Sequence, residues 1–97
     1  MKILAIGAHP DDIEIFMYGT LSACLNRGDE IAMIVVTDGS AGNVLSKENL
    51  AEIRKKETIN ALKYIGKPTF LEFPDGELPI QIEAINILKK QINILNP

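Results

Sequence analysis

Three short apolar runs alternate along the chain with three segments in which apolar residues recur at helical spacing. The apolar runs cover residues 2–8, 30–37 and 69–73. The segments with helical spacing cover residues 13–25, 47–65 and 80–95. Short continuous apolar runs are typical of strands buried on both faces, whereas an apolar stripe with a period near 3.6 residues is typical of a helix packed on a core. The pattern predicts the order strand, helix, strand, helix, strand, helix.

Repeated crossovers of this length favour a parallel sheet with helices on both faces, a doubly wound α/β fold. The chain ends at Asn96-Pro97, after the third strand and helix, where such a fold would continue into another strand. We therefore expect the domain to be truncated after its third β-α unit. In the usual strand order 3-2-1-4, the missing fourth strand would leave the first strand as a sheet edge, and an exposed edge invites association between copies.

Composition limits the classes of protein that the chain can represent. Its 97 residues, with 46% apolar and 24% charged side chains, suit one small globular domain. The net charge of -3, without a block of basic residues, argues against nucleic acid as a partner. The only cysteine, Cys24, cannot form an internal disulfide, and we expect it to be buried and inert in a cytoplasmic protein. The short apolar N-terminus predicts neither a signal peptide nor a membrane span.

The most distinctive motif follows the first predicted strand, at the sheet edge where α/β proteins bind ligands. His9 and Asp12 are three residues apart there, and an imidazole with a carboxylate suits zinc or a similar divalent transition metal. Asp11 must then point elsewhere, where it could act as a base toward the attacking water. The other interpretation is a capping box, with Asp11 as N-cap and Glu14 three residues later. The residues alone leave both interpretations open.

Three further motifs have both a chemical and a purely structural interpretation. "TDGSAG" at residues 37–42 could bring backbone N–H groups to an anion, although a plain turn is the simpler interpretation. Arg54 and Glu57 belong to a charged helical run that is best explained as a solvated face. Asp75 lies in "FPDGEL", where turn chemistry alone accounts for an aspartate.

Taken together, four motifs resemble the PIG-L/LmbE-like family of zinc-dependent de-N-acetylases, which act on N-acetylglucosamine-type substrates. They are "AHPDDIE" at 8–14, "TDGSAG" at 37–42, "RKKE" at 54–57 and "FPDGEL" at 73–78. The match runs along nearly the whole chain. The resemblance implies a Rossmann-like three-layer fold, with residues 1–97 as the N-terminal part of a single deacetylase domain.

The resemblance also assigns roles to individual residues. It implies His9 and Asp12 as zinc ligands, Asp11 as the general base, and Arg54 and Asp75 as residues that face a small N-acetylated sugar. Zinc would polarise the acetamide carbonyl while Asp11 takes a proton from the attacking water. The sequence departs from the family in two places. It lacks the later histidine motif that completes the zinc site and supplies a catalytic histidine, and Tyr18 stands where many relatives have glycine.

Two other classes of function compete with this hypothesis. One is a metal-free module that binds a nucleotide or phosphate at residues 39–42. The other is a non-catalytic fragment that a second chain stabilises along the first strand.

Overall fold

The computed structural model describes residues 1–38, 47–73 and 82–96. Its strands are β1 (Lys2–Gly7), β2 (Glu30–Thr37) and β3 (Thr69–Phe73). Its helices are α1 (Asp12–Phe16), α2 (Tyr18–Arg27), α3 (Lys47–Ala61) and α4 (Ile82–Leu95). All three strands are parallel, and β2 lies between β1 and β3 in the sheet.

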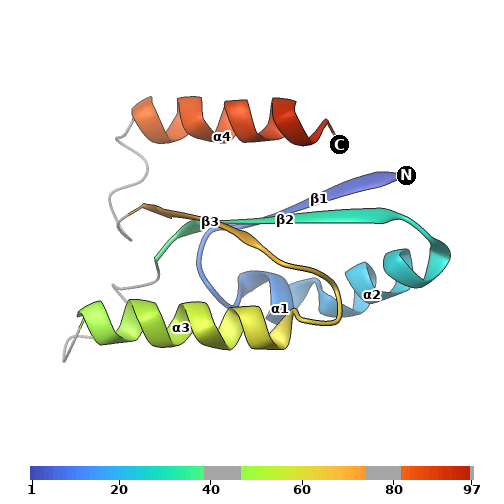
Figure 1. The fold of residues 1–97 in the computed structure, drawn as a ribbon, viewed down its shortest axis with the longest axis horizontal. Coiled ribbons are helices and arrows are strands. Elements are labelled where there is room, and N and C mark those ends of the chain that lie inside the picture. The colour runs from blue at the N-terminus through green and yellow to red at the C-terminus, as the bar shows by residue number, and fades with distance from the viewer. Residues whose placement is uncertain (39–46, 74–81, 97) are drawn as a thin grey trace.

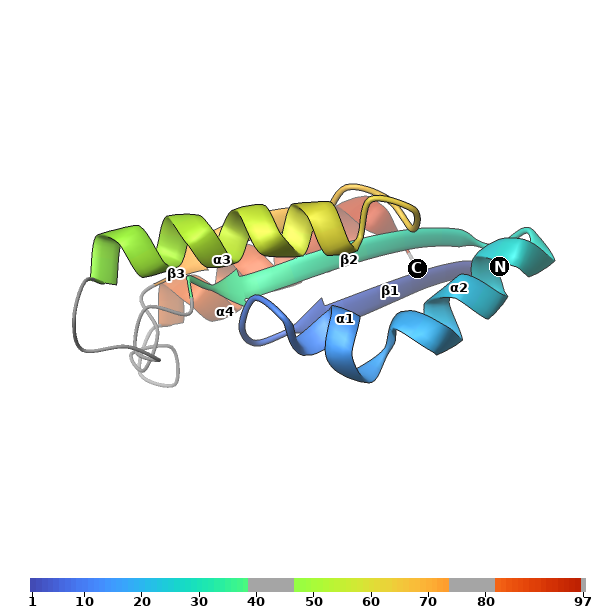
Figure 2. The same cartoon turned by 90° about the horizontal axis from the view of Figure 1, so that it is seen from below.

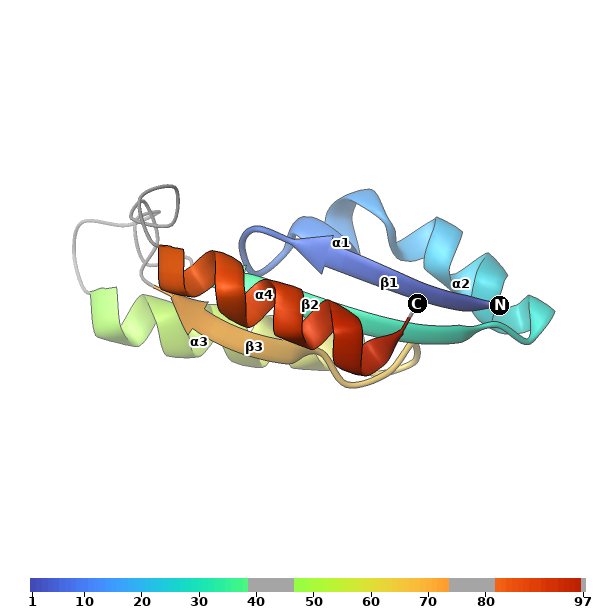
Figure 3. The same ribbon diagram turned by 90° about the horizontal axis from the view of Figure 1, so that it is seen from above.

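The helices form two layers, one on each face of the sheet (Figure 1). Helices α1, α2 and α3 cover one face, as the view from below shows (Figure 2). Helix α4 crosses the opposite face (Figure 3), and its last residues, Ile94 and Leu95, lie near the amino ends of β1 and β2. The three-layer α/β fold expected from the sequence is therefore confirmed. Among the described residues β1 pairs only with β2, so β1 is an edge strand as expected.

The core lies mainly between the sheet and the layer formed by α1, α2 and α3. Its buried members are Ala5, Ile13, Leu21, Met33, Val35, Leu62 and Ile65. Side chains along a strand alternate between its two faces. Accordingly Ile34 and Val36, which are also buried but lie outside this cluster, point to the face that α4 covers. The central strand is thus buried on both faces, which explains its continuous apolar sequence.

The helices differ in detail from the sequence-based expectation. The first predicted helix, residues 13–25, is divided into α1 and α2 at Met17, whose φ of -123° departs from helical geometry. The second helix ends at Ala61 rather than residue 65, because the last four residues form a turn that buries Leu62 and Ile65. The start predicted for the third helix, at residues 80 and 81, lies outside the described part of the chain.

Cys24 is half-buried rather than buried, so the expectation of a core thiol was wrong. It lies on α2 toward the C-terminal end, where the helix approaches solvent. Of the helices that the structure describes, none has the length and apolar character needed to cross a bilayer.

Gly7 allows α1 to pack closely against the end of β1. A Cβ atom at Gly7 would lie 3.0 Å from Ile13 Cγ1 and 3.2 Å from Asp12 Cβ. We expect Gly7→Ala to push α1 away and to lower the free energy of unfolding by about 1–3 kcal/mol, as overpacking does in other cores. For a domain of this size each kcal/mol lowers Tm by about 4–8 °C, which a thermal melt followed by circular dichroism would detect.

Gly19→Ala provides the matched control for this prediction. A Cβ atom at Gly19 has no heavy atom within 4 Å, and alanine is a better helix former than glycine in α2. This variant should keep or raise the Tm. Equal melting temperatures for Gly7→Ala and the unmodified protein would show that α1 does not depend on the close contact.

Candidate metal and catalytic site

The site is built on the tight connection between β1 and α1, at the carboxyl edge of the sheet. Asp12 Oδ2 accepts a hydrogen bond from the backbone N–H of His9 at 3.0 Å, and the N–H of Asp12 donates to the carbonyl of His9 at 3.2 Å. Pro10, which lies between His9 and Asp12 in the sequence, is fully buried. Thr37, at the end of β2, donates from both its hydroxyl and its N–H to the carbonyl of Ala8, at 2.7 and 2.9 Å. The turn is therefore anchored to two strands.

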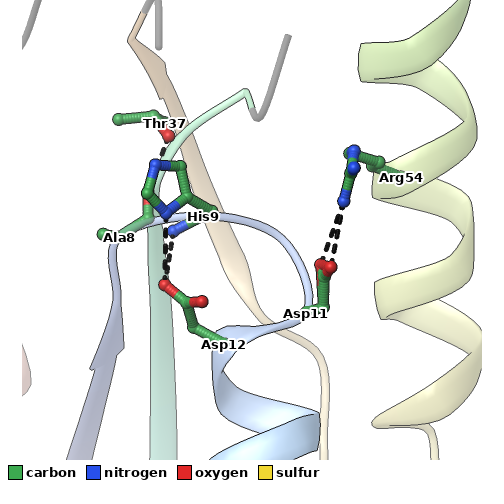
Figure 4. Close-up of polar contacts among 6 residues, drawn as sticks. All are labelled: Ala8, His9, Asp11, Asp12, Thr37 and Arg54. Atoms are coloured by element: carbon green, nitrogen blue, oxygen red, sulfur yellow. Dashed lines mark hydrogen bonds and ion pairs between the residues drawn. The ribbon is translucent and has the colours of Figure 1, made fainter. Parts of the chain in front are cut away.

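His9 and Asp12 converge on one point in this turn (Figure 4). His9 Nδ1 lies 3.4 Å from Asp12 Oδ2, and 48% and 33% of the two side chains are exposed. Two ligands bound to zinc at its usual distances in a tetrahedral arrangement lie about 3.3–3.5 Å apart. The observed separation therefore suits two ligands of a single zinc ion, and their exposure leaves the site accessible from solvent.

The capping-box interpretation of this segment is wrong. Asp11 does occupy the N-cap position of α1, but its side chain makes no capping hydrogen bond. Its φ of 88° places the residue in the left-handed region. Apart from glycine, aspartate is one of the few residues that adopt this conformation readily. The reciprocal bond is absent as well, because Glu14 Oε1 is buried without a hydrogen-bond partner among the described residues.

The left-handed backbone instead directs Asp11 away from His9 and Asp12 and toward α3 (Figure 4). Arg54 Nη1 donates to the two carboxylate oxygens of Asp11, at 2.9 and 3.4 Å. The Arg54 side chain is 29% exposed, so the interpretation of this position as part of a solvated face was wrong. The segment puts the two neighbouring aspartates into different environments, one beside an imidazole and one beside a guanidinium.

A second ion pair lies on α3 one residue further along. Lys55 Nζ donates to Glu72 Oε1 at 2.6 Å and lies 5.3 Å from the ring centroid of Phe70. The hydrogen bond to Glu72 raises the pKa of Lys55 above its ordinary value. Glu72 has a φ of 60° and lies within a β-bulge, where the three steps from Phe70 to Phe73 along β3 oppose two steps along β2. This pair could not be predicted from the sequence, because no glycine marks the bulge.

Several residues expected at the site lie outside the described residues. These are Asp75 with its "FPDGEL" turn beyond residue 73, and residues 39–42 of the "TDGSAG" motif. The nearest described part of that motif is the end of β2, where the N–H of Asp38 donates to the carbonyl of Phe73 at 2.9 Å. This bond holds the carboxyl ends of β2 and β3 together at the same edge of the sheet as His9.

The described part of the chain supplies two side-chain ligands for a metal ion at this site. Within it, no group of three or more histidine, cysteine, aspartate or glutamate side chains could hold an ion. A catalytic zinc ion normally has three protein ligands. His9 and Asp12 therefore fit as two of the three.

Comparison with known proteins agrees with the fold and with the motif that forms this turn. The sequence profile of the family described as "PIG-L: GlcNAc-PI de-N-acetylase" matches residues 4–97. An uncharacterized deacetylase of Escherichia coli K12, YaiS, is 36% identical over 93% of this chain and 50% of its own length. The diacetylchitobiose deacetylase of Thermococcus kodakarensis is 31% identical over 93% of this chain and 37% of its own.

The fold also agrees with that of a solved structure. The N,N'-diacetylchitobiose deacetylase of Pyrococcus horikoshii, in complex with an inhibitor, superimposes with a TM-score of 0.89. It is 35% identical, and the aligned region covers 99% of this chain and 38% of that one.

The fold and the motif thus define a Rossmann-like α/β domain of the deacetylase type. The chain belongs to the PIG-L family. It spans half or less of the length of these relatives.

Proposed function

We propose that the protein is a zinc-dependent hydrolase that removes the acetyl group from an N-acetylglucosamine-type sugar or conjugate. The observation that carries the proposal is the 3.4 Å approach of His9 Nδ1 to Asp12 Oδ2, which matches the spacing of two zinc ligands. Other divalent transition metals could occupy the same mixed nitrogen and oxygen site. A third ligand would come from residues outside those described or from another chain.

His9 and Asp12 would hold the ion, which when bound supplies Lewis-acid polarisation of the acetamide carbonyl. Asp11 is the general base: its carboxylate accepts a proton from the water that attacks the carbonyl carbon. Its side chain is 40% exposed, so water can reach it. The bond between carbon and nitrogen then breaks: the acetyl carbon keeps the water oxygen and is released as acetate, and the nitrogen leaves as an amine with a proton that came from the water.

Arg54 contributes in two ways within this proposal. Its Nη1 donates a hydrogen bond to Asp11 Oδ2 at 2.9 Å and so orients the carboxylate of the base. It also lines the groove between α1 and α3, and 29% of its side chain is exposed, so donors other than the buried Nε can reach a sugar hydroxyl. The assignment of Asp75 to the sugar rests on the family resemblance alone.

The relatives support the class of substrate. Two of them are named for deacetylation of diacetylchitobiose, which consists of N-acetylglucosamine units. A small N-acetylated sugar is therefore the substrate class that we propose. We place the protein in the cytoplasm, where the thiol of its single cysteine would stay reduced.

Release of free amine from N,N'-diacetylchitobiose tests the proposed function. The zinc-loaded protein should release amine, an excess of chelator should reduce the rate to background, and added zinc should restore it. An amine-reactive fluorophore measures the product. Amine release that persists in chelator would contradict the metal dependence, and no release from the zinc-loaded protein would contradict the deacetylase activity.

A further inference from the structure

A groove of about 280 Å³ lies between α1 and α3, next to Asp11. Its lining consists of Asp11, Glu14, Ile15, Arg54, Glu57, Thr58 and Ala61. Three of these side chains are carboxylates, and Arg54 is the single cation among them. The groove therefore has an excess of negative charge around one guanidinium.

Two residues that line this groove each have a polar atom that is buried without a hydrogen-bond partner among the described residues. One is a donor, Arg54 Nε, and the other is an acceptor, Glu14 Oε1. A buried polar atom without a partner destabilises the folded state, because it has lost its hydrogen bonds to water. Both atoms would gain from a bond between them, and the two residues line the same groove.

The shape of the guanidinium makes such a bond compatible with the contact already present. Arg54 reaches Asp11 through Nη1, which lies on a different edge of the planar group from the Nε–H. The edge that carries Nε also presents two parallel N–H groups, which suit a carboxylate. Arg54 can therefore bind Asp11 on one edge and a second carboxylate on the other.

We propose that Glu14 is this second carboxylate. The proposed bond requires a rotation of the Glu14 side chain toward Arg54 Nε, and it would hold the guanidinium between Asp11 and Glu14. Glu14 becomes a positioning residue: it fixes the plane of Arg54, and Arg54 in turn fixes the carboxylate of Asp11. The bond is independent of any activity, whereas its importance for the orientation of the base rests on the proposed function.

Glu57 is the natural comparison for Glu14. It lines the same groove and lies three residues from Arg54 on α3, but its side chain is exposed. An exposed carboxylate keeps its water, so it gains little from the guanidinium. The proposal therefore distinguishes a half-buried glutamate, Glu14, from an exposed one, Glu57, in the lining of the same groove.

The sequence offers a direct way to observe this bond. It contains only two arginines, Arg27 and Arg54, so a nitrogen-15 spectrum of arginine side chains should show two Nε–H signals. Arg27 Nε donates to Asp29 Oδ2 at 2.9 Å and provides an internal standard for a carboxylate-bound group. Arg54→Lys removes one signal and so assigns the other.

We expect the Arg54 Nε–H of the unmodified protein to exchange with water about tenfold more slowly than in free arginine, since a bond to a carboxylate protects the proton. Glu14→Gln replaces the carboxylate with an amide oxygen, which is a weaker acceptor, so it should make the exchange of this proton several-fold faster and leave the Arg27 signal unchanged. Glu57→Gln should change neither signal. Thermal melts of the variants show that each is folded under the conditions of the measurement.

Two results would overturn the proposal. One is an Arg54 Nε–H that exchanges at the rate of free arginine in the unmodified protein, a result that needs no variant. The other is a protected signal that Glu14→Gln leaves unchanged, which would show that another group or a water molecule binds the Nε edge. Neither result depends on zinc or on deacetylation, so a failure of this proposal is distinguishable from a failure of the proposed function.

Discussion

Replacing Asp11 with asparagine is expected to lower kcat for deacetylation by about 10²–10⁴-fold, the usual contribution of a general base. The amide cannot accept the proton of the attacking water, whereas His9 and Asp12 remain in place to hold the ion. Zinc content should therefore stay the same as in the unmodified protein. Parallel measurements of amine release and of zinc per chain would separate the loss of the base from the loss of the metal.

Asparagine is the appropriate substitute because of the backbone at this position. Asp11 has a φ of 88°, and asparagine is among the residues that adopt this left-handed conformation most readily. Alanine at the same position would add backbone strain, so a loss of activity in Asp11→Ala would have two explanations. The asparagine variant tests the chemistry of the side chain alone.

Asp29→Asn is the matched control for Asp11→Asn. Asp29 is the other aspartate held by an arginine, and it lies just before β2, at the opposite end of the sheet from the site. The hydrogen bond from Arg27 lowers the pKa of Asp29 below its ordinary value. The same chemical change there should leave kcat unchanged while the protein remains folded. Similar losses of kcat in both variants would point to a general loss of structure rather than to a catalytic base.

Replacing His9 with alanine is expected to weaken zinc binding by about 100-fold or more. The groups that merely orient a metal ligand are worth about 10- to 100-fold in affinity, so the loss of a direct ligand should cost at least as much. Asp12→Ala should have a similar effect, because the two side chains converge on one point. Titration calorimetry with zinc, together with zinc per chain after dialysis, would measure both.

Cys24→Ala controls for zinc bound elsewhere. A thiolate is a strong zinc ligand, and Cys24 is half-buried on α2, well apart from the turn in sequence. This variant should retain the zinc affinity of the unmodified protein. If zinc were lost in Cys24→Ala and kept in His9→Ala, the proposed site would be in the wrong place.

The fold could be predicted from the sequence because its strands and helices differ in the period of their apolar residues. The limits of β2 and β3 agree with the expected runs, because an unbroken run of mostly apolar residues marks each strand in the sequence. The break at Met17 could not be predicted, since the apolar spacing continues across it. A local change of φ does not alter the spacing of apolar residues, so the spacing cannot reveal it.

The site could be predicted only as far as its residues are neighbours in sequence. The spacing of His9 and Asp12 was sufficient to bring them together, because a tight turn leaves few arrangements for residues three apart. Arg54 lies 43 positions from Asp11, and its charged neighbours made the whole segment resemble a solvated face. Its contact with Asp11 depends on how α3 packs beside α1, which a pattern of polar residues does not encode.

The turn between β1 and α1 has a consequence for the thermodynamics and kinetics of metal uptake. Pro10 restricts its own φ and the conformation of His9, and hydrogen bonds from His9, Asp12 and Thr37 close the turn without any ion. The ligands are thus preorganised, and binding an ion need not order the backbone. Uptake should involve little loss of conformational entropy, and the ion should exchange without unfolding of the turn.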